Sequence, residues 1–347
     1  MINKRNNIQV DKWGNIEDYE IFKFTLENRN GTQAEFSNYG AHWLSLRHLN
    51  MASQFTDLLL GYETLEELIY DKFFFGSTIG RFANRIAKGK FRVEDQEYTL
   101  SVNNGPNHLH GGSGFNTKVW DYKIVEDKIQ FTYLSKDSED GYPGNLKVHV
   151  TYSLSDDDEL IIDYFASTDA PTIVSLTNHA YFNLNGSGSI LDHKLQINSE
   201  KFTPIDSTSI PLGYLKSVSK TPFDFRTPKL IRNQITMEDE QLVMGSGFDH
   251  NYVLQYDSLL YNAATLISES SGRGMDVFTT MPGIQFYSGN FLDGVKGKGG
   301  ANYKKNNGVC LETQFFPDSP NHMSFPSAIL NPMELYRHQS VYKFYNL

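Results

Sequence analysis

Alternating apolar and polar side chains are the clearest pattern in this chain. Leu146, Val148, Val150, Tyr152 and Leu154 are each separated from the next by one polar residue. A period of two predicts a β-strand with one buried face. Similar short runs, bounded by Gly, Pro, Asp or Asn, occur at residues 128–134, 159–165, 248–254 and 283–289.

Helical periodicity is confined to two short segments. In residues 63–72, Leu65, Leu68 and Ile69 share one face of a helix, and residues 238–243 show the same spacing more briefly. Helices are therefore expected to be few and short.

The order of the predicted elements indicates an all-β fold. Residues 91–93 and 97–100, joined by Glu94-Asp95-Gln96, predict a further hairpin. Many short strands without βαβ alternation favour a large antiparallel sandwich or barrel over a parallel sheet. Because no linker, low-complexity tract or internal repeat interrupts the pattern, a single domain over residues 1–347 is expected.

Composition and charge narrow the classes of partner. The chain is 39% hydrophobic, with 24 Phe and 20 Tyr, which is typical of a soluble globular protein. Its 31 Lys and Arg against 41 Asp and Glu give a net charge of −10. Nucleic acid and anionic membrane surfaces require a basic face, so neither is expected as a partner. A neutral ligand suits this charge better.

Two features favour a cytoplasmic protein. The single cysteine, Cys310, cannot form an internal disulfide, which suits a reducing compartment. Residues 1–15 contain basic residues without the apolar stretch of a signal peptide, and no segment resembles a membrane span.

Polar residues gather in five short segments rich in Gly, Pro and aromatic residues. Charged groups in such apolar surroundings need partners or a polar cavity, because unpaired burial costs several kcal/mol. One shared cavity would explain all of these segments, which are residues 80–86, 107–112, 178–186, 248–254 and 310–322.

Glu312 and His179 are the first candidates for chemistry. Apolar residues 309–311 and 315–317 surround Glu312, so desolvation would raise its pKa and make it a better base. The alternative is a surface glutamate paired with Arg or Lys. His179, in "NHAYFNL", is either a structural residue or a proton carrier near neutral pH.

The sequence His108-Leu109-His110 raises the hypothesis of a metal site. In an extended segment, residues i and i+2 project to one side, and a third ligand would have to come from His179, Asp249 or His250. The two glycines after His110 instead indicate a close backbone approach, to a ligand or within a tight turn.

Arginines, aspartates and aromatic residues offer binding groups with structural alternatives. Arg81 and Arg85 could bind ligand oxygens or form structural ion pairs, and Asp249 could accept hydroxyl protons or stabilise a loop. No glycine-rich segment ends in Gly-Lys-Ser/Thr, so no nucleotide cofactor is expected. Three aromatic residues could stack on a sugar or belong to the core, namely Trp120, Phe286 and Tyr287.

Seven motifs in one order resemble those of the aldose 1-epimerase (galactose mutarotase) family. Together they span roughly residues 30–345, and they read "GRFANRI", "LHGG", "DGYPG", "NHAYFNL", "FDHNYVL", "GIQFYSGN" and "CLETQFFPDSPN". The resemblance implies the mutarotase-like supersandwich, a large antiparallel β-sandwich with an open sugar cleft. It implies no metal and no organic cofactor, and we expect a monomer or a homodimer.

The resemblance also implies roles for individual residues. Glu312 is similar to the general base of the family, His179 to the general acid, and His110 to the histidine that holds the ring-oxygen side of the sugar. Three further residues resemble the hydroxyl-binding shell, namely Arg85, Asp249 and Gln285. The implied activity is interconversion of the α and β anomers of a free aldohexose such as galactose or glucose.

The chemistry of anomer interconversion suits these residue types. A base removes the proton of the C1 hydroxyl while an acid on the opposite side of the acetal protonates the ring oxygen, and the same groups reverse the steps. Two other classes remain open. Asp249 and Glu312 would also suit a glycoside hydrolase, and the same groups could serve a sugar-binding protein without catalysis.

Overall fold

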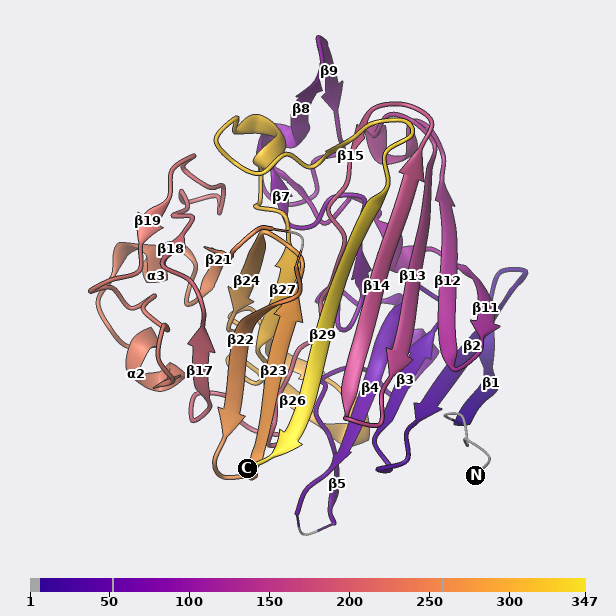
Figure 1. Cartoon of the computed structure of the whole chain (residues 1–347), viewed down its shortest axis with the longest axis vertical. Coiled ribbons are helices and arrows are strands. Elements are labelled where there is room, and N and C mark those ends of the chain that lie inside the picture. Colours follow the sequence, from indigo (N-terminus) through magenta and orange to yellow (C-terminus); the bar gives the residue numbers. More distant parts are fainter. Residues whose placement is uncertain (1–6, 52, 258) are drawn as a thin grey trace.

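A nine-stranded antiparallel sheet is the largest element of the protein, with the C-terminal strand at its centre (Figure 1). The computed structural model describes residues 7–51, 53–257 and 259–347. In spatial order the strands are β11 (Asp121–Val125), β12 (Lys128–Ser135), β13 (Leu146–Leu154), β14 (Glu159–Thr168), β29 (Tyr336–Asn346), β23 (Arg273–Thr279), β22 (Tyr261–Ser268), β17 (Lys194–Ile197) and β20 (Lys229–Leu230).

Two five-stranded antiparallel sheets accompany the large one. The first follows chain order, with β1 (Asn7–Ile16), β2 (Tyr19–Glu27), β3 (Gln33–Ser37), β4 (His42–Leu49) and β5 (Phe55–Asp57). The second has the order β19 (Lys216–Ser217), β18 (Lys201–Phe202), β21 (Asp249–Val253), β24 (Gly283–Tyr287) and β27 (Cys310–Gln314).

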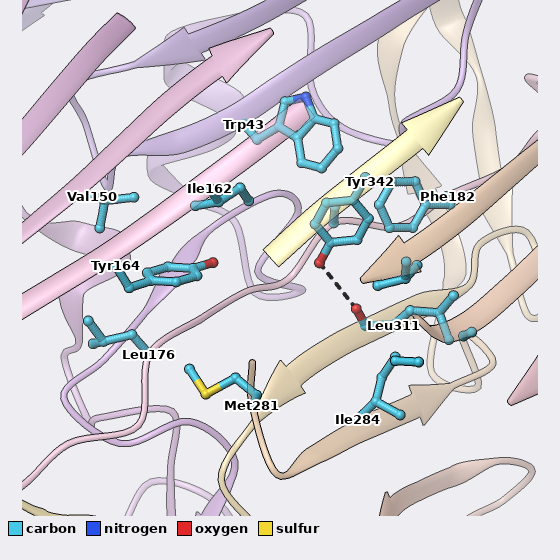
Figure 2. Close-up of a cluster of buried hydrophobic side chains, with 14 of the residues drawn as sticks. Trp43, Val150, Ile162, Tyr164, Leu176, Phe182, Met281, Ile284, Leu311 and Tyr342 are labelled. Atoms are coloured by element: carbon cyan, nitrogen blue, oxygen red, sulfur yellow. Dashed lines mark hydrogen bonds between the residues drawn. The ribbon is translucent and has the colours of Figure 1, made fainter. Parts of the chain in front are cut away.

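Both five-stranded sheets pack against the same face of the large sheet. Tyr342 of β29 lies with its ring 5.4 Å from that of Trp43 in β4, and its hydroxyl donates to the carbonyl of Leu311 in β27 at 3.3 Å (Figure 2). The predicted all-β sandwich is confirmed. Layers joined by such large buried rings owe most of their stability to apolar burial, about 25 cal/mol per Å².

The predicted strands are confirmed with small differences at their ends. In β13, Leu146, Val148 and Val150 are fully buried, whereas Lys147 is exposed and His149 is half-buried. β14 runs three residues beyond its predicted end, to Thr168. The period of two therefore identified the buried face correctly.

Three α-helices are present among the described residues, namely α1 (Leu65–Ile69), α2 (Ile231–Ile235) and α3 (Glu240–Met244), besides five single-turn 3-10 helices. α1 begins at a capping box. The Thr64 hydroxyl accepts a hydrogen bond from the backbone amide of Glu67, and the Glu67 carboxylate accepts one from the backbone amide of Thr64. The prediction that Ile69 shares the buried face is wrong, because its side chain is 37% exposed where the helix ends. α2 was not predicted, and it has no side-chain cap.

The predicted hairpin consists of β8 (Lys90–Val93) and β9 (Gln96–Thr99). Val93 pairs with Gln96, so Gln96 belongs to the strand and the turn is only Glu94-Asp95. Glu94 has a φ of 53°, in the left-handed region that tight hairpin turns require. A prediction of Gln96 as a turn residue is therefore corrected.

The remaining strands are short. They are β6 (Thr78–Ile79), β7 (Arg85–Ile86), β10 (His108–Leu109), β15 (Thr172–Ile173), β16 (Thr177–Asn178), β25 (Asp293–Lys296), β26 (Asn302–Lys304) and β28 (Ile329–Leu330). They pair as β6 with β16, β7 with β10, β15 with β28, and β25 with β26. Within the part of the chain that the structure describes, no helix has the length and apolarity needed to cross a membrane.

Candidate active site

A cavity of about 610 Å³ brings together segments that are far apart in the sequence. Strands β21, β24 and β27 contribute one wall, and loops beside β7, β10 and β16 contribute the others. Five of the six predicted site residues line it, namely Arg85, His110, His179, Asp249 and Glu312.

Glu312 projects from β27 into a nearly dry environment. Its side chain is 2% exposed, and its Oε2 atom has no hydrogen-bond partner among the described residues. Burial raises the pKa of this carboxyl well above its usual value, the Asp249 charge raises it further, and Arg85 opposes both. The alternative of a surface glutamate paired with Arg or Lys is wrong.

Main-chain hydrogen bonds hold His179 just after β16. Its amide donates to Ser77 O at 2.9 Å, and its carbonyl accepts from the Gly76 amide at 3.0 Å. Its ring is stacked beside that of Tyr181, with centroids 5.1 Å apart. Burial lowers the pKa of His179 to about 4, and a bond to its own carbonyl opposes that shift.

Glu312 and His179 face each other directly. The Oε1 atom of Glu312 lies 3.7 Å from Nε2 of His179, and Nδ1 of the same ring lies 3.6 Å from the Cys310 thiol. Burial moves the two pKa values in opposite directions, up for the Glu312 carboxyl and down for the His179 ring. The expectation that the two groups act from opposite sides of an acetal stays a prediction, since the structure shows only that they are neighbours.

His110 presents a donor to the cavity. Its Nδ1 accepts from the Asn84 amide at 3.1 Å, and because an amide N–H can only donate, the neutral ring carries its proton on Nε2. Its ring centroid lies 5.2 Å from that of His179. Nitrogen and oxygen atoms of His110, His179 and Glu312 lie within 4.8 Å of one another, as a metal would require. A metal ion bound at Nε2 would have to displace that proton. His110 therefore suits the role of a hydrogen-bond donor better than that of a metal ligand.

His108 lies outside the cavity. Its Nδ1 is 2.6 Å from Ser101 O, and its Nε2 is 2.7 Å from the Tyr142 hydroxyl, in the "DGYPG" motif. The predicted pairing of His108 with His110 on a metal is wrong. His110 has a φ of 52°, which ends the extended conformation that would have placed both rings on one side.

Arg85, Asp249 and Gln285 form a connected polar group. Arg85 donates from Nε to Asn104 at 3.1 Å, and its NH1 lies 3.9 Å from Asp249. The side-chain amide of Gln285 donates a hydrogen bond from Nε2 to Oδ1 of Asp249 at 2.7 Å. Burial raises the pKa of Asp249, against the influence of Arg85 and Gln285. Gln285 does not line the cavity and acts through Asp249 instead.

Several residues that line the cavity gave no signal in the sequence. Phe74 is the most central, because its ring lies 4.8 Å from that of His110 and 5.9 Å from that of His179. Asp71 fixes this loop by accepting from the amides of Phe73 and Phe75. The other unpredicted lining residues are Lys72, Phe73, Asn104, Gly105, Pro106, Ser207, Thr208, Ser209, Met244, Ser246 and Phe291.

Two of the three candidate aromatic residues are structural. Trp120 and Phe286 belong to the buried core, whereas Tyr287 lines the cavity. Gly111 has a φ of 80°, and a Cβ there would lie 1.8 Å from Gly80 O. The close backbone approach predicted after His110 is therefore between Gly111 and the backbone of Gly80, and it is not a contact with a ligand.

A second hollow, of about 850 Å³, lies beside β4 and β5. None of the predicted site residues lines it. Most of its charged groups are paired with one another, Lys23 and Arg47 with Glu35 and Lys298 with Asp57. The smaller cavity is therefore the better candidate for chemistry, because it contains the titratable groups with strongly shifted pKa values.

Known proteins resemble this chain over almost its whole length. Residues 23–343 match the family model of aldose 1-epimerase. A galactose mutarotase from Bos taurus is 42% identical over 328 residues, covering 93% of this chain and 94% of the relative. The aldose 1-epimerase of Escherichia coli (strain K12) is 38% identical over 326 residues, covering 92% and 94%.

Solved structures agree with these sequence matches. The crystal structure of an aldose epimerase homologue from C. elegans has a TM-score of 0.86 and 31% identity, covering 99% of both chains. That of a galactose 1-epimerase from Lactobacillus acidophilus NCFM has a TM-score of 0.88 and 28% identity, covering 98% of this chain and 99% of the other. By fold, by sequence and by the extent of the match, the chain belongs to the aldose 1-epimerase family.

Proposed function

We propose that this member of the aldose 1-epimerase family interconverts the anomers of a free aldohexose such as galactose or glucose, with Glu312 as general base and His179 as general acid. The observation that carries the proposal is the buried contact of 3.7 Å between these two groups at the wall of the cavity. The relatives named galactose mutarotase support an aldohexose as substrate.

The proposed reaction needs only one proton on the pair. With that proton on His179, ionised Glu312 takes the proton of the C1 hydroxyl, and Nε2 of His179 protonates the ring oxygen as its bond to C1 breaks. Rotation about the C1–C2 bond exposes the other face of the aldehyde, and the reverse transfers close the ring. Both oxygens are bonded to C1, so neighbouring groups can serve both.

Sugar binding falls to the polar groups around this pair. Arg85 can donate to sugar hydroxyls and Asp249 can accept from them, while the Nε2–H of His110 can donate to a sugar oxygen. Gln285 would keep the Asp249 carboxylate in position. These roles follow from the donors and acceptors that line the cavity.

Polarimetry of freshly dissolved α-D-galactose and α-D-glucose tests the proposal. The protein should accelerate the approach to the equilibrium rotation in proportion to its concentration. A sugar-binding protein without catalysis would leave the rate at its spontaneous value, which would contradict the proposal. Release of the chromophore from a nitrophenyl galactoside would instead indicate the glycoside hydrolase.

The pH dependence of kcat/KM should reflect the one-proton state of the pair. Since the pKa of His179 is about 4, the pair gains a second proton only near that pH, and kcat/KM should be level from neutral pH to roughly pH 5 and fall below it. Loss of the Glu312 proton should lower kcat/KM at the alkaline end. The measurement is polarimetry with the spontaneous rate subtracted, and circular dichroism checks folding at each pH. A fall that begins near pH 6.5 would contradict this assignment.

Three expectations remain predictions. They are the cytoplasmic location, the monomeric or homodimeric state, and the organisation of residues 1–347 as a single domain.

A further inference from the structure

The segment that follows the Glu312 strand returns to the strand that carries Arg85. Asp318, in the "PDSPN" part of the last motif, donates its amide to Arg85 O at 2.7 Å. Its Oδ1 atom accepts from the Ala87 amide at 2.9 Å. Arg85 begins β7 and Ala87 follows its last residue, so Asp318 bonds to the backbone at both ends of this short strand, where a neighbouring strand would otherwise pair.

The other edge of β7 is already paired. Leu109 of β10 lies opposite Arg85, and His110 follows it directly. Arg85 is therefore held between the segment that carries His110 and the segment that follows Glu312. Since the Arg85 guanidinium lines the cavity, the backbone on both sides of it determines where that guanidinium lies.

Burial and several side-chain contacts fix the position of Asp318. Its side chain is 2% exposed, and its φ of 57° lies in the left-handed region. The Asn321 amide donates to Oδ1 at 2.6 Å, and Nε2 of His322 lies 3.2 Å from Oδ2. A buried carboxylate with all of these partners fixes its backbone more firmly than an exposed turn residue could.

We propose that Asp318 is a positioning residue for the reaction, which places Arg85 at a set distance from Glu312 by holding the edge of the Arg85 backbone that β10 does not pair with. This inference rests on the proposed function, in which Arg85 binds sugar hydroxyls. Asp318 itself does not line the cavity, so it acts only through Arg85. A displaced arginine weakens sugar binding more than proton transfer, so KM should change more than kcat.

Two variants separate the hydrogen bond from the backbone conformation. Asp318→Gly tolerates the left-handed φ but removes the acceptor, and we expect it to raise KM about tenfold with kcat changed less. Asp318→Asn keeps both an acceptor oxygen and tolerance of the left-handed region, so its KM should stay within about threefold of the wild type. His322→Ala removes the contact with Oδ2 and the ring packing on Phe325 but leaves Oδ1 on the Ala87 amide, so it should leave KM unchanged. If Asp318→Gly does not fold, Asp318→Ser, whose hydroxyl is shorter, replaces it.

A double-mutant cycle with Arg85→Ala tests whether the effect passes through the arginine. In that background, Asp318→Gly should raise KM no further. Equal KM increases for Asp318→Gly with and without Arg85, or equal losses for Asp318→Asn and Asp318→Gly, would overturn the inference. If Arg85→Ala itself leaves KM unchanged, the proposed binding role of Arg85 fails. If Arg85→Ala raises KM and Asp318→Gly does not, only the clamp fails.

Discussion

Glu312→Gln and His179→Asn are each expected to lower kcat for anomer interconversion by about 10²-fold or more. A carboxamide cannot take a proton from the C1 hydroxyl, and neither amide can exchange protons at neutral pH. Glu312 Oε2 has no partner among the described residues, so glutamine in its place should not disturb the fold. Polarimetry measures kcat, and thermal unfolding confirms that each variant is folded.

The two substitutions should not be additive. Because base and acid work in one reaction, the double variant should lose little more than either single one. Glu97→Gln is the matched control, since this glutamate lies exposed on the β8–β9 hairpin and its carboxylate pairs with Lys90 at 3.1 Å, outside the cavity lining. A folded Glu312→Gln or His179→Asn variant with the wild-type rate would remove that residue from the mechanism.

Arg81→Met should destabilise the protein by at least about 3 kcal/mol. Arg81 is 2% exposed and donates to the main-chain carbonyls of Ser135, Lys136 and Pro143 at 2.8 to 2.9 Å. Methionine is apolar and cannot replace these donors. The Lys136 carbonyl still accepts from the Glu139 amide at 3.1 Å, but the carbonyls of Ser135 and Pro143 lose the charged donor, at about 1–3 kcal/mol each. Urea unfolding followed by circular dichroism measures the free energy of unfolding.

Arg47→Met is the control for this prediction. Arg47 is half exposed and lies 3.7 Å from Glu35, so its replacement should change the free energy of unfolding by no more than about 0.5 kcal/mol. Similar losses for the two variants would show that the carbonyl contacts of Arg81 contribute little. The hypothesis that Arg81 forms a structural ion pair is corrected here, because within the described ranges its hydrogen bonds go to carbonyl and hydroxyl oxygens.

Strands and helix ends could be predicted from the sequence wherever neighbouring residues determine them. The alternation in residues 146–154 predicted β13 to the residue, because each side chain of a strand takes the face that its neighbours do not. Thr64 and Glu67 mark the start of α1 for the same reason, since a capping box lies within four residues. α2 has no such cap and was missed.

The sequence by itself determined the class of fold and the set of chemical groups, because periodicity and motif order are properties of neighbouring residues. The motif resemblance singled out Arg85 and His110, but only the tertiary structure gives the physical reason why these two face the cavity and Arg81 and His108 do not. Arg85 lines it while Arg81 binds carbonyls, and His110 lines it while His108 binds Tyr142. These choices depend on backbone turns such as the left-handed φ of His110 and on pairing between β7, β10 and the Asp318 segment. Such contacts join residues far apart in the chain, so no local pattern contains them.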